Sequence, residues 1–314
     1  MNIITQEAKN KQAIVEQALK KGKSKTARKY HVALSSLKRW CSQYNGTWQS
    51  LLPKSRRPHH HPKQHTVAEE RMISEAFWKL FERYGWDGVY TEIKKQGYKR
   101  SYSGMIYAAK RLGLPEEERK KKPSRKTVRR YPELLEPGEK VQIDVKEVPY
   151  NCLRGEALRD NKRFYQWTAV DECSRVRFVY AFEDHTAQNT VKFFKMLKKI
   201  FPFKIRKVQT DNGAEFTNRF LDTEKEHPFD QILKTQGIEH VLIPPRTPWH
   251  NGKVERSHRN DQRYFYDWET FRNLDELNQK MSVHLNWSNN KCMRTLDGQS
   301  PNEILQQKMS CKFA

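Results

Sequence analysis

The spacing of apolar residues in the first part of the chain predicts helices. Apolar positions recur every three or four residues over 6–20, and 23–44 shows two shorter periodic runs around a turn at His31 and Val32. This is the helix-turn-helix pattern, in which the second helix enters the major groove, although an ordinary three-helix bundle has the same spacing. Ala33 stands where Ser or Thr usually caps that second helix. The expected inward positions are Ala27, Val32, Leu37 and Trp40.

A second helical stretch begins after residue 65. Thr66 and Glu69 have the spacing of a capping box, and helical periodicity continues through Phe81. A shorter helix near 89–96 and a further helix from Ser101 follow. The order helix, helix, turn, helix predicts a second module of the helix-turn-helix kind.

From residue 138 onward, short runs of β-branched and aromatic residues alternate with helical stretches. Strands are expected at 140–148, 164–170, 176–182, 207–210 and 239–242. Helices are expected at 186–200, 229–236, around Glu255 and at 274–287. The order β-β-β-α-β-α-β-α is typical of a mixed α/β sheet flanked by helices.

A length of 314 residues allows two or three domains, each with its own core. We divide the chain into a helix-turn-helix domain (1–51), a basic linker (52–65), a second helix-turn-helix-like domain (66–115), a basic linker (116–137), an α/β core (138–270) and a C-terminal helical extension (271–314).

Charge separates the two halves of the chain. The net charge is +23, and residues 1–137 hold 31 Lys and Arg against 13 Asp and Glu. Such an excess favours binding to a polyanion through counterion release, so the first half is expected to bind DNA. A solubilising surface, or a ribosomal or membrane-surface role, would explain the charge equally well.

The remaining composition points to a cytoplasmic protein with no membrane partner. No apolar run has the length of a membrane span, and the first residues lack a signal-peptide core. The five cysteines are scattered along the chain without the regular spacing of a disulfide framework, which fits reduced thiols. His59, His60, His61 and His65 could suggest zinc, but no CxxC accompanies them and the flanking composition favours a basic linker.

Three acidic residues stand out by their surroundings: Asp144 in VQIDV, Asp211 in VQTDNGAEFTN and Glu255 in TPWHNGKVERSHR. Carboxylates brought together from separate elements can hold the divalent ions that activate water and stabilise a reacting phosphate. Two other acids compete for these roles. We interpret Asp171 as a turn residue beside Arg175 and Glu215 as a support for its local turn.

The segments around Asp211 and Glu255 resemble those of DDE transposases of bacterial insertion sequences, within the retroviral-integrase superfamily. The resemblance implies a ribonuclease H-like fold over 138–270, with Asp144, Asp211 and Glu255 as catalytic and metal-binding residues for two Mg²⁺ ions, which Mn²⁺ can replace. It departs in one respect: 43 residues separate Asp211 from Glu255, against about 35 in the family. We place the surplus in a surface insertion at 221–230, which costs little closure entropy.

Candidate DNA contacts follow from these assignments. In the two helical modules they are Ser35, Ser36, Lys38, Arg39, Tyr102, Ser103, Tyr107, Lys110 and Arg111. In the linkers they are Arg56, Arg57, Arg125, Lys126, Arg129 and Arg130. Around the third acid, Trp249, Asn251 and Lys253 belong to a predicted flexible loop, and His258 and Arg259 follow Glu255 by one helical turn.

The predicted function is that of a nucleoid-associated transposase. It would bind the terminal inverted repeats of its mobile element, cleave the DNA ends and join each 3′-OH to target DNA. We expect a homodimer or larger oligomer assembled on DNA. A DNA-binding regulator with an inactive core, or a ribonuclease H-type nuclease that cuts without joining, are the alternatives.

Overall fold

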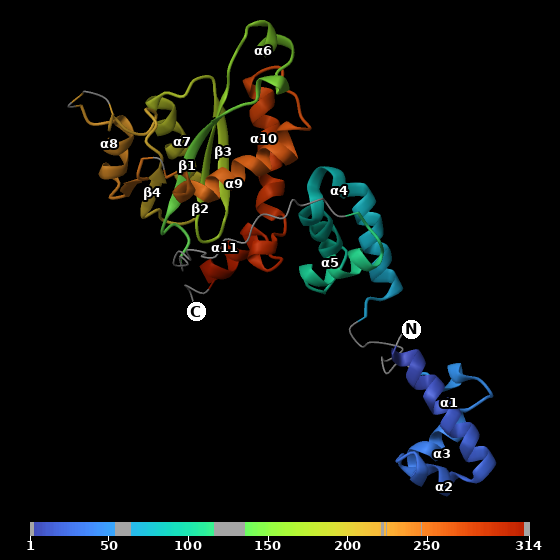
Figure 1. Ribbon diagram of the computed structural model, residues 1–314. Coiled ribbons are helices and arrows are strands. Elements are labelled where there is room, and N and C mark those ends of the chain that lie inside the picture. Colours follow the sequence, from blue (N-terminus) through green and yellow to red (C-terminus); the bar gives the residue numbers. More distant parts are fainter. Residues whose placement is uncertain are drawn as a thin grey trace. The chain divides into compact units, whose positions relative to one another are not determined.

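The computed structural model describes residues 3–53, 64–115, 136–220, 223, 225–245 and 247–310. The chain forms two compact units, Met1–Gln64 and His65–Ala314 (Figure 1). Within the described ranges, no helix is both long and apolar enough to cross a lipid bilayer.

The N-terminal unit is helical, with α1 at Ile3–Lys21, α2 at Lys23–Lys29 and α3 at Leu34–Gln43, followed by a 3₁₀ turn at Trp48–Leu51. His31 takes a φ of 51° in the turn between α2 and α3, and α3 begins after Ala33 without a side-chain cap. The unit's core consists of Val15, Ala18, Ala27, Leu37 and Leu51, with Val32 and Trp40 packed against it. The predicted inward positions are therefore confirmed.

The second unit begins with α4 (Val67–Lys95) and α5 (Tyr102–Arg111). The capping box forms as predicted, because Thr66 Oγ1 accepts from the Glu69 amide and the Glu69 carboxylate accepts from the Thr66 amide. Gly85 has φ 58° and ψ −163°, a conformation open to glycine, and it divides α4 into the two predicted helical stretches.

Polar contacts join α4 to residues near the C-terminus. Lys291 forms an ion pair with Asp87 at 3.2 Å, and Lys94 forms one with Glu303 at 3.0 Å. The Cys292 amide also donates to Thr91 Oγ1 at 2.8 Å. Helix α4 therefore packs in the same compact unit as the sheet.

The sheet is mixed and has the strand order β3-β2-β1-β4-β5. Its strands are β1 at Val141–Glu147, β2 at Tyr165–Asp171, β3 at Arg177–Phe182, β4 at Lys207–Thr210 and β5 at Glu239–Leu242. β1, β2 and β3 pair antiparallel, whereas β4 is parallel to both β1 and β5. This is the predicted mixed α/β sheet.

Helices cover both faces of the sheet (Figure 1). They are α6 at Gly155–Arg159, α7 at Ala187–Ile200, α8 at Pro228–Thr235, α9 at Gly252–Asp261, α10 at Leu274–Asn290 and α11 at Pro301–Ser310, with a π-helical turn at Gln262–Tyr266. Phe178 packs with α7 residues such as Phe193, while its neighbour Val179 packs with Leu277 of α10. Successive strand residues face opposite sides, so each face has its own core.

Candidate active site

Three acidic residues far apart in the sequence line one cavity of about 460 Å³. Asp144 lies within β1, Asp211 follows the last residue of β4, and Glu255 lies in the first turn of α9. β1 and β4 are parallel neighbours with Gln142 opposite Gln209. Asp144 and Asp211 each lie two residues beyond these glutamines. Their side chains therefore lie next to each other across the two strands and on the same face of the sheet.

Burial and mutual repulsion perturb this group of acids. Burial, followed by the charges of Asp211, Glu215 and Glu255, raises the pKa of Asp144 to about 7. Burial and Asp211 also raise the pKa of Glu215. His258 Nδ1 lies 3.6 Å from Asp144 Oδ2, but burial lowers the pKa of His258 to about 4, so its ring is neutral at pH 7. The acids therefore repel one another, and the neutral His258 ring does not offset that repulsion.

The chemistry of these side chains fits a divalent metal ion. Oxygen donors in a partly buried cavity suit Mg²⁺, and a cation would offset the repulsion that raises the pKa of Asp144. Among the residues that the structure describes, however, no three His, Cys, Asp or Glu side chains are arranged around a single metal position. The three acids share a cavity without converging on one point.

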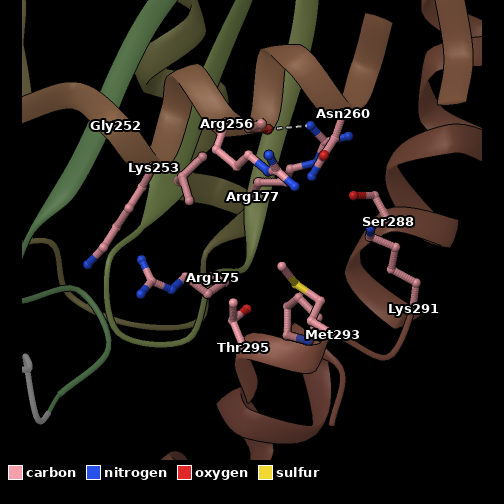
Figure 2. Close-up of a pocket in the computed structure, with 13 residues that line it drawn as sticks. Arg175, Arg177, Gly252, Lys253, Arg256, Asn260, Ser288, Lys291, Met293 and Thr295 are labelled. Carbon is pink, nitrogen blue, oxygen red and sulfur yellow. Dashed lines mark hydrogen bonds between the residues drawn. The ribbon is translucent and has the colours of Figure 1, made fainter. Parts of the chain in front are cut away.

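A buried ion pair fixes α9 to β3. The Arg177 guanidinium donates to Asp261 Oδ1 at 2.6 Å. It also donates to Ser257 Oγ (Figure 2). Asp261 further accepts from Gln166 at 2.8 Å and contacts His284 at 3.0 Å. Burial alone would raise the pKa of Asp261, but Arg177 and His284 lower it. The helix that carries Glu255 is thus held by a charged group that is costly to disrupt.

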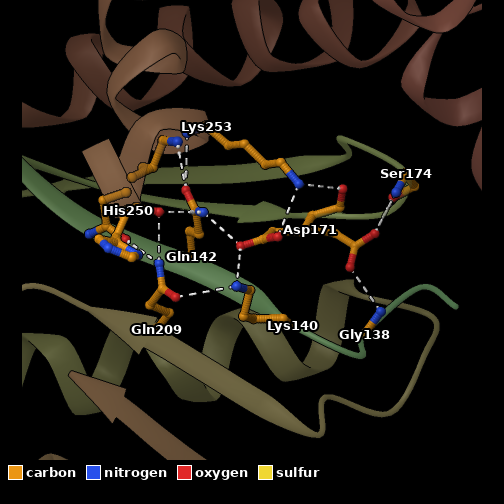
Figure 3. A network of polar contacts seen from close by, with 11 residues as sticks. Gly138, Lys140, Gln142, Asp171, Ser174, Gln209, His250 and Lys253 are labelled. Carbon is orange, nitrogen blue, oxygen red and sulfur yellow. Dashed lines mark hydrogen bonds and ion pairs between the residues drawn. The ribbon is translucent and has the colours of Figure 1, made fainter. Parts of the chain in front are cut away.

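Two glutamines hold the other end of α9. Gln142 Oε1 accepts from the Lys253 and Val254 amides at 3.2 and 3.1 Å, which satisfies donors at the start of the helix. Gln142 and Gln209 both donate to the His250 carbonyl, at 3.1 and 3.0 Å (Figure 3). Each glutamine lies two residues before a motif acid on its strand, so the strands that carry two acids also position the third.

Glu172 completes this network and determines where Lys253 points. Its carboxylate accepts from Lys140 at 2.9 Å, from Lys253 at 3.0 Å and from Gln142 at 2.7 Å (Figure 3). Lys253 is therefore paired, and it lines a different cavity from the three acids. The segment predicted as a flexible loop is instead helical, with Trp249 and Asn251 in a 3₁₀ turn (Pro248–Asn251) and Lys253 in α9.

The two competing acids have different surroundings. Asp171 is buried at the end of β2 and accepts from the Gly138 amide and from the amide and hydroxyl of Ser174 (Figure 3). Asp171 is thus the last residue of β2 and not itself a turn residue, but its carboxylate supports the turn that follows, and it is not among the residues that line the acid cavity. Glu215 lies beside Gly213 and raises the pKa of Asp144, so it belongs to the acid cluster more closely than its sequence position indicated.

The structure places the predicted DNA contacts in several settings. On α3, Ser35, Lys38 and Arg39 are exposed and Ser36 is half-buried; on α5, Ser103, Tyr107, Lys110 and Arg111 are exposed. The prediction of a DNA contact at Tyr102 is wrong, because this side chain is buried and its hydroxyl donates to Asp87 at 2.8 Å. Arg56, Arg57, Arg125, Lys126, Arg129 and Arg130 lie outside the described residues.

Around α9, Trp249 and Arg259 are exposed, whereas His258 is half-buried beside Asp144. Asn251 is buried and lines the acid cavity. Its Oδ1 accepts from Gln209 at 3.0 Å, and its Nδ2 has no hydrogen-bond partner within the described part of the chain. This amide is a donor available to a bound oxygen atom.

Two further predictions are affected by the fold. Of the candidate zinc ligands, His59, His60 and His61 lie outside the described residues, and His65 pairs with the Tyr98 hydroxyl at 2.7 Å. The predicted surface insertion at 221–230 is too long, because Phe229 is fully buried in the first turn of α8.

Comparison with known families identifies the second unit's sheet region. Residues 135–248 and 236–291 each match a family described as "Integrase core domain". Residues 135–291 belong to the integrase core family. Together with the mixed sheet and its flanking helices, this match confirms the ribonuclease H-like fold class.

Individual relatives cover parts of the chain. The integrase core region is similar to "Putative integrase ORF3" of Spiroplasma virus SpV1-C74, with 29% identity over 154 residues, covering 46% of this chain and 42% of that protein. It is also similar to the retrovirus-related Pol polyprotein from transposon TNT 1-94 of Nicotiana tabacum, with 32% identity over 124 residues, covering 38% and 9%. The chain spans less than half the length of these relatives.

Among solved structures, the catalytic core domain of BIV integrase aligns with 22% identity and a TM-score of 0.40, covering 56% of this chain and 99% of that one. The HTLV-2 integrase catalytic core domain in complex with magnesium aligns with 22% identity and a TM-score of 0.39, covering 54% and 97%.

Proposed function

We propose that this protein is a transposase that cleaves DNA at the ends of a mobile element and joins the 3′-OH to target DNA. The observation that carries the proposal is that three acids from β1, β4 and α9 line one cavity of an integrase core. A protein that only binds DNA gains nothing from carboxylates gathered where phosphates would approach. This favours an enzyme over a DNA-binding regulator.

Asp144, Asp211 and Glu255 would hold two Mg²⁺ ions, for which Mn²⁺ can substitute. Such ions activate a water or a 3′-OH and stabilise the charge of the reacting phosphate. The Asn251 Nδ2 donor would bind a phosphate oxygen in the same cavity. The exposed side chains of Trp249 and Arg259 would bind the DNA that flanks the reacting phosphate.

Recognition of the terminal inverted repeats would fall to the helical modules. Ser35, Ser36, Lys38 and Arg39 of α3 would contact bases and phosphates, and Ser103, Tyr107, Lys110 and Arg111 of α5 would extend the contact. The compact N-terminal unit, with its own core and its exposed basic α3, supports this assignment.

The test is a joining assay with Mg²⁺, a labelled terminal-repeat duplex and a target plasmid. Asp144→Asn, Asp211→Asn and Glu255→Gln should each abolish cleavage and joining but leave duplex binding intact, because a carboxamide keeps the shape and loses the charge. Asp160→Asn, an exposed acid at the end of α6, is the matched control and should remain active.

The products distinguish the alternatives. Joined product supports the transposase, cleavage alone supports a nuclease, and binding without either reaction supports a regulator. Near-normal activity in any one triad variant would remove that residue from the metal site.

A further inference from the structure

A second cavity, of about 240 Å³, lies along a different stripe of α9 from the acid cavity. Lys253, Arg256, Ser257 and Asn260 line it, at the spacing of one helical face, whereas Glu255 lines the acid cavity. The rest of its wall comes from β3, the turn before it, the end of α10 and the segment that follows (Figure 2). Elements distant in sequence therefore build this cavity.

The described residues that line this cavity include several cations and no acid. Its cationic lining residues are Arg175, Arg177, Lys253, Arg256 and Lys291. Arg177 forms an ion pair with Asp261, Lys253 with Glu172 and Lys291 with Asp87, and these acids lie outside the lining. Arg256 is exposed and forms no ion pair with any acid in the described part of the chain. Like charges gathered in this way favour an anion between them.

The titration of two lysines reflects this crowding. Burial lowers the pKa of Lys291. The ion pair with Asp87 opposes this shift, and the nearby Arg177 and Arg256 add to it. Burial also lowers the pKa of Lys253, with Arg175 as the next cause.

Arg177 has a donor that the protein leaves unused. Its side chain is 5% exposed, and its two terminal nitrogens donate to Ser257 and Asp261. Its Nε is buried and has no hydrogen-bond partner among the residues that the structure describes. A buried N–H on a charged group is costly to leave unpaired, so an acceptor is expected at this wall.

We propose that this cavity is a binding site for a phosphate group, distinct from the acid cavity. A phosphate carries up to two negative charges and several acceptor oxygens, so it can accept from more of the guanidinium groups that line this cavity than a single carboxylate can. Asn260, Ser288 and Thr295 add neutral donors to the same wall. The phosphate belongs either to a nucleic-acid backbone or to a small free molecule.

The test uses the full chain in EDTA, so that no metal bridges a phosphate to the acid cluster. Isothermal titration with pyrophosphate should show saturable binding to the wild type. Arg256→Gln and Arg175→Gln should each weaken it about tenfold, the typical effect of losing one charge-assisted hydrogen bond. Lys199→Gln, which removes an exposed charge at the end of α7, is the matched control and should bind as the wild type does.

A second experiment, with a DNA duplex, identifies the molecule that supplies the phosphate. If pyrophosphate competes with a DNA duplex and both cavity variants also weaken duplex binding, the site holds a backbone phosphate. If duplex binding is unchanged while pyrophosphate binding falls, the site holds a free phosphate compound. The proposal would be overturned if the wild type showed no saturable binding of pyrophosphate. It would also be overturned if both cavity variants, with unchanged melting curves, bound pyrophosphate as tightly as the wild type. None of these readouts requires cleavage or joining, so they are independent of the proposed activity.

Discussion

At the scale of single residues, Asp144 shows how position changes the chemistry of a carboxyl group. In the unfolded chain it ionises near the ordinary aspartate pKa of 3.8, whereas in the fold burial and three neighbouring acids raise its pKa to about 7. Between these two values the folded protein holds a proton that the unfolded chain has released. The free energy of unfolding must therefore fall as pH rises through this window and level off above it.

We predict that the metal-free protein is less stable at pH 8 than at pH 5 through Asp144. The contribution is on the order of 1 to 4 kcal/mol, given 1.36 kcal/mol per pKa unit. Urea denaturation in EDTA at both pH values measures it. Asp144→Asn should remove most of this contribution, whereas Asp160→Asn should not. If the free energy of unfolding of Asp144→Asn depended on pH as that of the wild type does, the pKa of Asp144 would not be raised in the folded protein.

At the scale of elements, the active site depends on how α9 is joined to the sheet. Gln142 and Gln209 are opposite each other on parallel strands, and both reach the His250 carbonyl just before the helix. At the far end of α9, Arg177 holds Asp261. These contacts determine where Glu255 stands relative to the two aspartates.

We predict that Gln142→Ala lowers the rate of joining by about ten- to a hundredfold, because a misplacement near 1 Å can have that effect. Gln209→Ala should act in the same direction. Duplex affinity should change little. The melting temperature should fall, because both side chains are buried and their loss leaves buried donors and acceptors without partners. Gln188→Ala, an exposed position on α7, provides the control in single-turnover assays. If Gln142→Ala weakened duplex affinity and left the rate of joining unchanged, Gln142 would have a role in DNA binding.

At the scale of the whole molecule, charge and architecture point in the same direction. The chain has a net charge of +23, and its N-terminal unit forms a compact helical body with basic residues exposed on α3. The integrase core lies in the other unit. DNA recognition and phosphate chemistry can therefore be tested separately.

We predict that the N-terminal unit supplies much of the salt-dependent affinity for DNA. Lys38→Gln and Arg39→Gln should each weaken binding to the element's ends and, where the residue contacts a phosphate, reduce the slope of log K against log salt by about 1. Fluorescence anisotropy over a range of salt concentrations measures this, with Lys199→Gln as the charge-matched control. Equal slopes in all four proteins would place the phosphate contacts elsewhere.

We also predict that oligomerisation depends on DNA. Joining two ends to two target strands requires at least two active sites, and each chain carries one set of the three acids. Self-repulsion of a +23 chain disfavours association until phosphates neutralise it. Light scattering should detect dimers or larger species only with a terminal-repeat duplex. Activity should fall more steeply than linearly when Asp211→Asn protein is mixed with wild type; a linear fall from a monomeric complex would contradict assembly on DNA.

The sequence by itself determined the features that depend on neighbouring residues. Apolar periodicity predicted the five strands and most of the helices, but not α6, α11 or the 3₁₀ turn at Pro248–Asn251. The T-x-x-E spacing predicted the start of α4, and the contexts of Asp144, Asp211 and Glu255 identified the acids that share a cavity. Only the tertiary structure decided which surfaces those elements bury. In the folded protein the Tyr102 side chain is buried, and Gln142 and Gln209 both donate to the His250 carbonyl. Five cationic residues also line a second cavity. Contacts between distant segments depend on strand register and helix packing, and neither can be predicted from the spacing of residues along one segment.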